Sequence, residues 1–182
     1  MSNAKKLMMA AAGGGGPSGY IVGVENAVST TNNLFVVDIS NNSSPSVVGN
    51  LQYTHFNGAR SIAAYPSGNR VYVCGYTNRQ ISCIDMSDPT SPSVSGTFTT
   101  PSGWNPIKIG ITGDVLLVYE HKSGDTDGRL TSYDLTSSLT SPTQIDQVTG
   151  TDGALMQSAS FDNDNGRLWM ATVADVVMMW DY

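Results

Sequence analysis

Few residues of this 182-residue chain have the chemistry for catalysis or metal binding, since it has only two histidines and two cysteines. No motif of a zinc protease, a nucleophile elbow, a Walker phosphate loop or a dinucleotide-binding loop is present. Hydrolysis would need a nucleophile, a base and a group that orients the base. His55 or His121 could in principle serve as such a base, but nothing in the sequence nominates its partners. We therefore expect a protein that is not an enzyme and has no cofactor and no metal site.

The two cysteines, Cys74 and Cys83, flank a candidate turn at Asn78-Arg79. If these two residues form the whole turn of a β-hairpin, Cys74 lies opposite Cys83 in a non-hydrogen-bonded pair. Their Cα atoms would then be about 4.5 Å apart, near the lower limit of disulfide geometry. Two interpretations stay open: a cross-strand disulfide, or two packed thiols, which the reducing conditions of intracellular assembly favour.

Aspartates occur in two patterns, and we expect both to be structural. The loops Asp125–Gly128 and Asp162–Gly166 offer oxygen ligands for calcium but lack the bidentate glutamate of an EF-hand, and the second aligns with an ordinary hairpin turn. The other pattern places an aspartate at the end of each of four strand-like runs, where it can accept backbone N–H bonds in the following turn. These four residues are Asp38, Asp85, Asp134 and Asp181.

The same four aspartates mark a sequence repeat, because they are spaced 47, 49 and 47 residues apart. A Ser-Pro pair follows the first three aspartates, with its proline at offsets of 7, 7 and 8 residues, and a glycine follows the first two aspartates at an offset of 11. In the second repeat, turn residues separate four predicted strands, at Arg60–Ala64, Val71–Tyr76, Gln80–Asp85 and Ser93–Thr97.

Four-stranded units repeated every 40 to 50 residues or so are typical of β-propeller blades. We therefore predict an all-β fold, a β-propeller-like array of four-stranded antiparallel blades. The approximate repeats are 20–59, 60–106, 107–156 and 157–182, with three, four, four and three predicted strands. About three and a half blades do not close a ring, so the array is incomplete or is completed by other chains.

The composition agrees with a turn-rich β protein and excludes several other classes. Only 13% of residues are charged, and Ser, Thr, Asn and Gly together number 71 of 182, which excludes a helical bundle. A hydrophobic content of 40% is too high for a disordered chain. The net charge of −6 argues against nucleic acid as a partner. No apolar run approaches the length of a membrane span.

Two segments of the second repeat resemble known repeat families. Val71–Gly75 and Cys83–Pro89 are similar to the LVIVD and YVTN repeats of surface propellers. The resemblance extends over roughly residues 20–182. It implies a propeller fold that is displayed on a surface.

Residues 1–19 stand apart from these repeats. Lys5, Lys6, Leu7, Met8 and Met9 begin a short apolar segment that ends at Ala12, and the Gly-rich linker Gly13–Gly16 follows. We predict that 1–19 are a docking peptide with a linker, with a disordered tail or a cleaved signal as alternatives. Ala4–Gly13 also resembles the N-termini of virion structural proteins of tailed phages, which implies other virion proteins as partners.

The connections between blades contain aromatic residues. In a propeller, the link between consecutive blades lies at the same end as the turn between the second and third strands. We therefore expect five residues to gather on one rim and to bind a partner there, namely Tyr53, His55, Phe56, Trp104 and His121. The alternative is that Phe56 and Trp104 fill the gaps between blades.

These observations together predict a non-enzymatic structural protein of a phage virion, either a capsid decoration or a tail appendage such as part of a tail fiber. Its expected partners are other virion proteins, copies of itself, or a host-surface glycan or receptor, with no nucleic acid and no membrane span. The alternatives are a secreted bacterial or archaeal adhesion module at the cell surface, and a fragment of a propeller enzyme.

Overall fold

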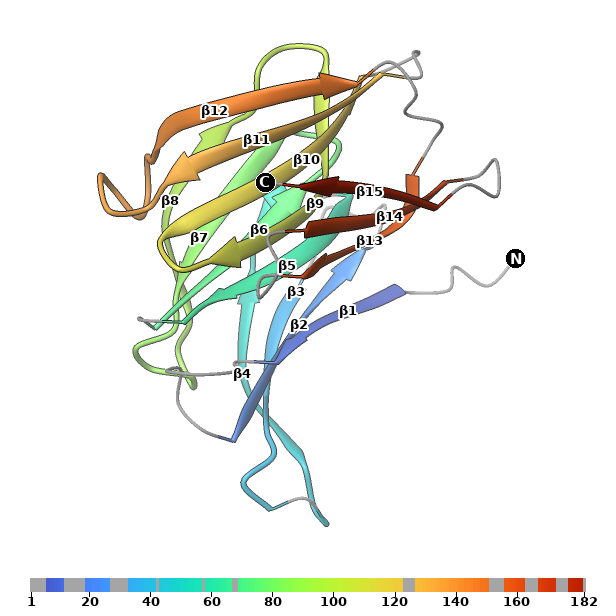
Figure 1. Cartoon of the computed structure of the whole chain (residues 1–182). Coiled ribbons are helices and arrows are strands. Elements are labelled where there is room, and N and C mark those ends of the chain that lie inside the picture. The colour runs from blue at the N-terminus through green and yellow to red at the C-terminus, as the bar shows by residue number, and fades with distance from the viewer. Residues whose placement is uncertain are drawn as a thin grey trace.

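The computed structural model describes residues 6–11, 19–26, 33–41, 43–56, 58–66, 69–122, 127–150, 156–162, 167–172 and 177–181. Within these ranges it contains fifteen strands and one short 3-10 helix, η1 (Thr54–Phe56). The strands form four antiparallel sheets in which each strand pairs with its neighbours in sequence. Figure 1 shows the sheets in chain order, from blue to red. The predicted all-β, propeller-like fold is confirmed.

The first three sheets have four strands each, and the fourth has three among the described residues. The first contains β1 (Lys6–Ala11), β2 (Tyr20–Asn26), β3 (Asn33–Asp38) and β4 (Ser46–Gln52). The second contains β5 (Ala59–Tyr65), β6 (Arg70–Gly75), β7 (Gln80–Asp85) and β8 (Ser93–Thr99). The third contains β9 (Trp104–Thr112), β10 (Val115–Lys122), β11 (Gly128–Asp134) and β12 (Thr143–Gly150). The fourth contains β13 (Met156–Asp162), β14 (Arg167–Thr172) and β15 (Val177–Asp181).

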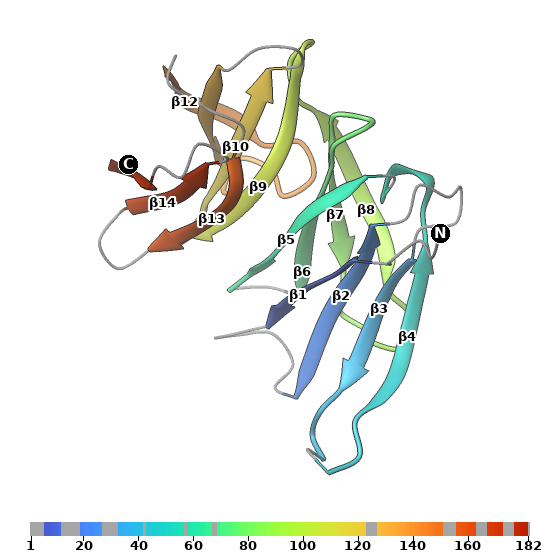
Figure 2. The same ribbon diagram turned by 90° about the vertical axis from the view of Figure 1, so that its right-hand side faces the viewer.

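The sheets follow one another along an arc, and the first and fourth sheets lie at its two ends (Figure 2). The first strand of each of the first three sheets is the innermost, since β5 contacts both β1 and β9. The second sheet therefore packs between the first and the third. This is the stacking of propeller blades, in which each sheet buries one face against the blade before it and the other against the blade after it.

Strand β1 corrects the prediction that residues 1–19 lie outside the repeats. All six residues of β1 pair with β2, from Lys6 opposite Asn26 to Ala11 opposite Ile21. So short an apolar segment is not a stable helix in water, whereas strand pairing satisfies its backbone hydrogen bonds. The first repeat thus has four strands instead of three. The predicted docking residues Lys6, Leu7, Met8 and Met9 belong to this strand, and Lys5 and the glycine linker lie outside the described residues.

Two hydrophobic clusters fill the spaces between the first three sheets. The cluster between the first and second sheets includes Val24, Val36 and Ile84. The cluster between the second and third sheets includes Tyr72 and Leu116, and the Tyr72 hydroxyl donates a 2.8 Å hydrogen bond to the backbone carbonyl of Leu139. The central strands of the second sheet are therefore buried on both faces, which explains why Val71–Gly75 is a continuous run of buried residues.

The aspartates that end the third strands have the predicted structural role in the first three sheets. The backbone N–H of the residue two positions later donates a 2.8 Å hydrogen bond to Oδ1 of each, as the N–H of Ser40 does to Asp38. The other two pairs are Ser87 with Asp85 and Thr136 with Asp134. The hydroxyls of Ser87 and Thr136 also donate to Oδ1 of Asp85 and Asp134. These hydroxyl bonds, followed by the backbone bonds, hold the pKa of Asp85 and Asp134 below its usual value, and for Asp38 the backbone bond from Ser40 is the main cause. The residue that follows Asp181 lies outside the described part of the chain.

Candidate functional site

The connections predicted to share one rim do lie at one end of the second and third sheets. The N–H of Tyr76, in the β6–β7 turn, donates to the carbonyl of Gly58, in the link between the first two sheets, at 3.0 Å. The N–H of Thr100, in the next link, donates to the carbonyl of Arg79 at 2.9 Å. Lys122, at the β10–β11 turn, lies opposite Trp104 in the register. We call this end, made of residues 53–56, 58–60, 76–79, 100–104, 120–122 and 127–131, the rim.

The aromatic residues of the first link form a compact group. The ring of Tyr53 lies edge-on to His55 at a centroid distance of 4.7 Å and to Phe56 at 5.4 Å. Phe56 is fully buried in the cluster between the first and second sheets. Phe56 therefore fills the gap between blades, as the alternative interpretation proposed, whereas Tyr53 and His55 are partly exposed.

Trp104 covers a buried ion pair on the third sheet. The guanidinium of Arg129 lies 4.4 Å from the centre of the Trp104 ring, and its Nε donates a 2.7 Å hydrogen bond to Oε2 of Glu120. The hydroxyl of Thr131 donates to the same oxygen at 2.7 Å. Glu120 is fully buried and Arg129 is 5% exposed. Trp104 itself is partly exposed, so its indole both shields the ion pair and reaches the surface of the rim.

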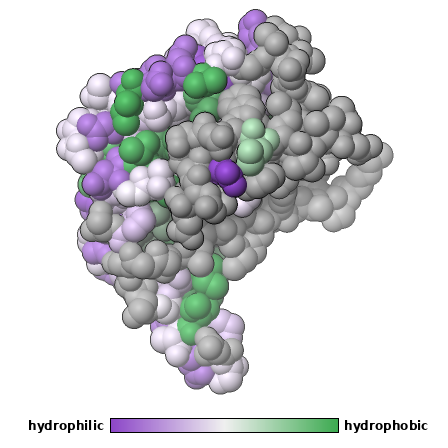
Figure 3. All heavy atoms as spheres, in the orientation of Figure 1, coloured by the Kyte–Doolittle hydropathy of each residue, from purple (hydrophilic) through white to green (hydrophobic). Residues whose placement is uncertain are grey.

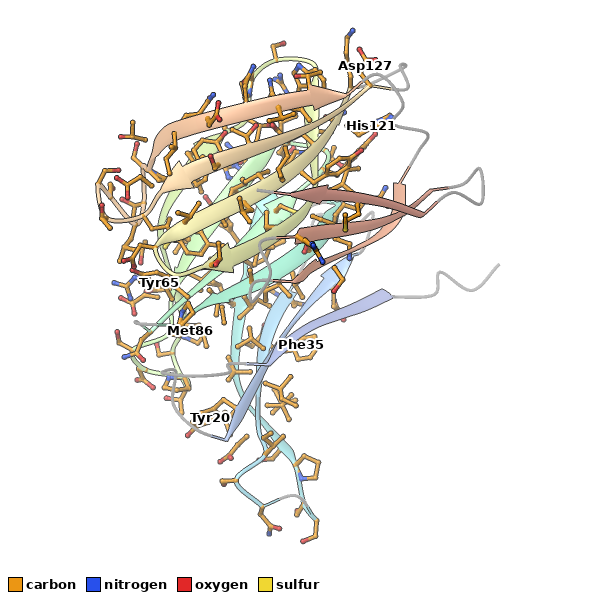
Figure 4. All side chains as sticks on the ribbon, in the orientation of Figure 1. Tyr20, Phe35, Tyr65, Met86, His121 and Asp127 are labelled. Atoms are coloured by element: carbon orange, nitrogen blue, oxygen red, sulfur yellow. The ribbon has the colours of Figure 1, made fainter. Side chains whose placement is uncertain are left out.

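His121 is buried, at 4% exposure, and lies beside Glu120 on β10. Because neighbours along a strand point to opposite faces, His121 faces away from the Glu120–Arg129 pair. Its Nε2 has no hydrogen-bond partner among the described residues. Figure 4 shows His121 near Asp127, at the opposite end of the sheets from Tyr65. His121 therefore belongs to the rim in position, but its side chain is not part of the exposed surface.

Sequence reasoning missed an exposed arginine at the rim. Arg60, on β5, places its guanidinium 4.8 Å from the centre of the Tyr76 ring. Arg60 interrupts the β5–β6 register, because Ala59 and Ser61 pair with consecutive residues of β6. Such a bulge turns its side chain away from the alternating pattern of the strand. The accessible part of the rim thus includes Tyr53, His55, Trp104 and the stacked pair of Arg60 and Tyr76, beside small polar residues such as Thr54 and Ser102.

The predicted pairing of the two cysteines is wrong. Cys74 lies opposite Ile81, and Cys83 lies opposite Tyr72, because the turn has four residues, Tyr76–Arg79, instead of two. Both thiols are free and buried between the second and third sheets. Burial raises the pKa of the Cys74 thiol to about 12 and also raises that of Cys83. These residues are structural thiols rather than a disulfide.

The described residues also contain no group of three or more His, Cys, Asp and Glu side chains that could hold a metal ion. The two acidic loops lie largely outside these residues, since 123–126 and 163–166 are not described. No helix in the described ranges is both long and apolar enough to cross a membrane.

The repeats match a family model. The model of the LVIVD repeat matches residues 28–52 and 58–100, which cover part of the first sheet and the whole of the second. The chain is a β-propeller repeat protein. The matched ranges contain strands β3 and β4 and the whole second blade of the propeller, and they include both segments that resemble LVIVD repeats in sequence.

Solved structures share the fold of this propeller at low sequence identity. A structure of a nidogen/laminin complex aligns with a TM-score of 0.66 and 14% identity, over 98% of this chain and 61% of that one. The β-propeller domain of Cps50 (Swd1) from Myceliophteria thermophila aligns with a TM-score of 0.65 and 9% identity, over 98% of this chain and 54% of that one. A 6-phosphogluconolactonase-like protein from Bacteroides uniformis aligns with a TM-score of 0.58 and 11% identity, over 96% of this chain and 66% of that one.

The propeller therefore spans between about half and two thirds of the length of these chains. No curated protein matches its sequence.

Proposed function

We propose that this propeller is a non-enzymatic interaction protein that contacts its partner through the rim of the second and third blades. The aromatic and arginine side chains that are accessible at the rim carry the proposal. Tyr53, His55 and Trp104 are partly exposed, and the exposed Arg60 stacks on Tyr76. Aromatic residues and arginine are the types enriched in protein interfaces, because they combine a large contact area with directional hydrogen bonds.

The side chains at the rim support binding more than catalysis. Glu120 is the buried carboxylate there, and both Arg129 and Thr131 occupy its Oε2. Because Glu120 is fully buried, a substrate could not reach it without opening the sheet. A general base must lie within hydrogen-bond reach of the proton that it removes.

We further propose that this interaction takes place in a phage particle, as part of a capsid decoration or a tail appendage. Its support is the resemblance of Ala4–Gly13 to the N-termini of phage virion proteins. Because Lys6–Ala11 is the innermost strand of the first blade, attachment would run through the rim and not through a separate N-terminal peptide. In the alternative, secretion with loss of the first 12 residues, the blade would lose this strand.

The rim proposal is tested by site-specific photocrosslinking in purified particles. A photoreactive phenylalanine derivative replaces Arg60, which is exposed at the rim, or Asp114, which is exposed at the opposite end of the sheets. We expect a crosslink to another virion protein from position 60 and none from position 114. A crosslink from position 114 alone, or from neither position, would contradict the rim as the contact surface.

The location is tested separately, by mass spectrometry of the same particles. We expect peptides that include Lys6–Ala11. If the protein is absent from purified particles, or is found only in a secreted form, the virion proposal is wrong and the adhesion alternative takes its place.

A further inference from the structure

The first sheet has two apolar faces, and only one is covered. Val22 lies opposite Val36 and Val24 opposite Leu34, and this face packs on the second sheet with all four residues at most 3% exposed. The alternate residues lie on the other face. Four of the described ones are apolar, and we call this group the open face: Ile21, Phe35, Val37 and Val47. Asn50, opposite Phe35, and the hydrogen-bonded pair of Asn33 and Glu25 lie on the same side of the sheet.

The open face is apolar and accessible. Ile21, Phe35 and Val37 are partly exposed, and Val47 is 65% exposed, the most exposed large hydrophobic residue of the described chain. None of the four belongs to either of the two core clusters. Figure 3 shows apolar surface in the corresponding region, at the lower end of the molecule near β3 and β4. A β-sheet with both faces apolar requires a partner on each face.

The repeat identifies what covers the equivalent face elsewhere. Val37 directly precedes Asp38, as Ile84 precedes Asp85 and Tyr133 precedes Asp134. Ile84 is fully buried in the cluster that it shares with the first sheet. Tyr133 is 5% exposed, and the centroid of its ring lies 5.2 Å from that of Phe98 in the second sheet. This position is therefore covered by the blade that precedes it in the stack.

The second strand of each of the first three sheets shows the same dependence on the preceding blade. Ile21, Val71 and Leu116 each follow the residue that pairs with the aspartate of their own sheet. Val71 is 3% exposed and Leu116 is fully buried. Ile21 is partly exposed because the first sheet has no blade before it in the described chain.

Met179 of β15 occupies the complementary position in the fourth sheet. Met179 lies two residues before Asp181, as Cys83 lies two residues before Asp85. Cys83 belongs to the cluster that packs on the following blade, and it is fully buried. Met179 is 44% exposed. At Met179 the fourth sheet thus presents an exposed apolar side chain in the position that, within the second sheet, packs against the next blade.

We infer that the open face docks a second copy of this chain, with the fourth sheet of each copy packed on the first sheet of the other. The contact continues the interface that already joins the first sheet to the second and the second to the third. Such a contact is heterologous, and it forms a closed ring only if the rotation between blades allows it. The described residues of each copy form four sheets, so those of two copies supply eight. Known propellers typically have about four to eight blades, which limits a closed ring to two copies. This inference concerns a surface other than the rim and does not depend on the proposed function.

The test is the mass of the 182-residue chain in solution, measured by sedimentation equilibrium and native mass spectrometry. We expect twice the 19.3 kDa of one chain. Val47→Asp places a carboxylate on the open face and is expected to halve the mass, because the dimer would bury an unpaired charge. Ile145→Asp is the matched control, since Ile145 is also an exposed aliphatic residue, at 57%, but lies on β12 of the third sheet. This control is expected to remain dimeric.

A mixing experiment tests which faces meet. Met179→Asp alters the fourth sheet and is also expected to give a monomer. An equimolar mixture of Val47→Asp and Met179→Asp keeps one intact pair of faces, so we expect it to recover a two-chain species that neither variant forms alone. Far-ultraviolet circular dichroism of each variant checks that the sheets are retained.

The inference is overturned by a monomeric parent chain, by an assembly larger than two copies, or by a Val47→Asp variant that keeps the parent mass. It is also overturned if the mixture stays monomeric. A contact between identical faces would instead leave Met179→Asp dimeric, which would likewise contradict the fourth sheet as the partner.

Discussion

Gly96 of β8 lies against Thr140 of the following blade so closely that no side chain fits between them. A Cβ atom on Gly96 would come within 2.6 Å of Cβ of Thr140. Gly49 of β4 has the same relation to the second blade, where its Cβ would overlap the carbonyl oxygen of Pro89. Both glycines come 11 residues after the aspartate of their repeat. The repeated glycine is therefore the point at which the outer strand of one blade meets a loop of the next.

We expect alanine at either glycine to loosen the stack. Gly96→Ala should lower the free energy of unfolding by about 1–3 kcal/mol, the usual cost of overpacking. Gly49→Ala should cost more than Gly96→Ala, because its neighbour is a backbone carbonyl that cannot rotate away. Urea unfolding measures both. Ser95→Ala, at an exposed position of the same strand as Gly96, is the control. An unchanged midpoint for Gly49→Ala would contradict the close approach of the blades.

The repeat pattern was sufficient to predict most of the fold. For the second blade the predicted strand Gln80–Asp85 has the observed bounds of β7, because turn residues on both sides of this apolar run determine where the strand begins and ends. β1 could not be predicted in the same way, because none of the repeat's markers lies near Lys6–Ala11. Its strand conformation depends on the exposed edge of β2, which is a tertiary feature.

The register at the cysteines shows a second limit. Arg79 has a φ of 54°, a left-handed conformation that usually signals glycine or asparagine. With arginine at position 79, the sequence contained no sign that the turn has four residues. The longer turn shifts the register by two residues, so Cys83 pairs with Tyr72 instead of Cys74. At the rim, the charges of Glu120 and Arg129 face each other only because β10 and β11 pair at these positions. Only the known length of the turn between them could have indicated this pair.

The ion pair between Glu120 and Arg129 yields a prediction on stability. Arg129→Met removes the guanidinium and leaves the fully buried Glu120 carboxylate without its charged partner. We expect a loss of about 3–5 kcal/mol, as for other broken buried pairs. Urea unfolding of the variant measures this loss.

A double variant separates the ion pair from the packing around it. Glu120→Leu combined with Arg129→Met removes both charges, so we expect it to be more stable than Arg129→Met alone. If the double variant is instead less stable than Arg129→Met, the carboxylate has another partner that compensates for its burial.

The aspartates at the ends of the third strands predict a loss of stability in acid. Hydrogen bonds from Ser40, Ser87 and Thr136 lower the pKa values of Asp38, Asp85 and Asp134 below the unfolded value of 3.8. A carboxyl whose pKa is lower in the folded state contributes stability above its unfolded pKa, and this is lost as the pH falls through the folded pKa. We expect the urea concentration at the midpoint of unfolding to decrease when the pH is lowered below about 4.

The triple variant with asparagine at positions 38, 85 and 134 is the corresponding control. An amide oxygen can still accept the backbone N–H bond but does not titrate in this range. The variant should therefore be less stable than the parent near pH 7 and should lose less stability between pH 5 and pH 2. An equal loss in both proteins would assign the acid sensitivity to other carboxyl groups.

The buried thiols predict slow reaction with thiol reagents. The thiolate is the reactive form, and burial raises the pKa of Cys74 to about 12, so almost none is present near neutral pH. Both cysteines are fully buried between the second and third blades, which also excludes the reagent. We expect negligible labelling by a chromogenic disulfide reagent at pH 8 in native buffer and labelling of two thiols per chain in urea. Cys83→Ser should reduce the number of labelled thiols in urea to one without speeding the native reaction. Rapid labelling in native buffer would mean that these blades separate readily, and the absence of labelling in urea would mean that the cysteines form a disulfide after all.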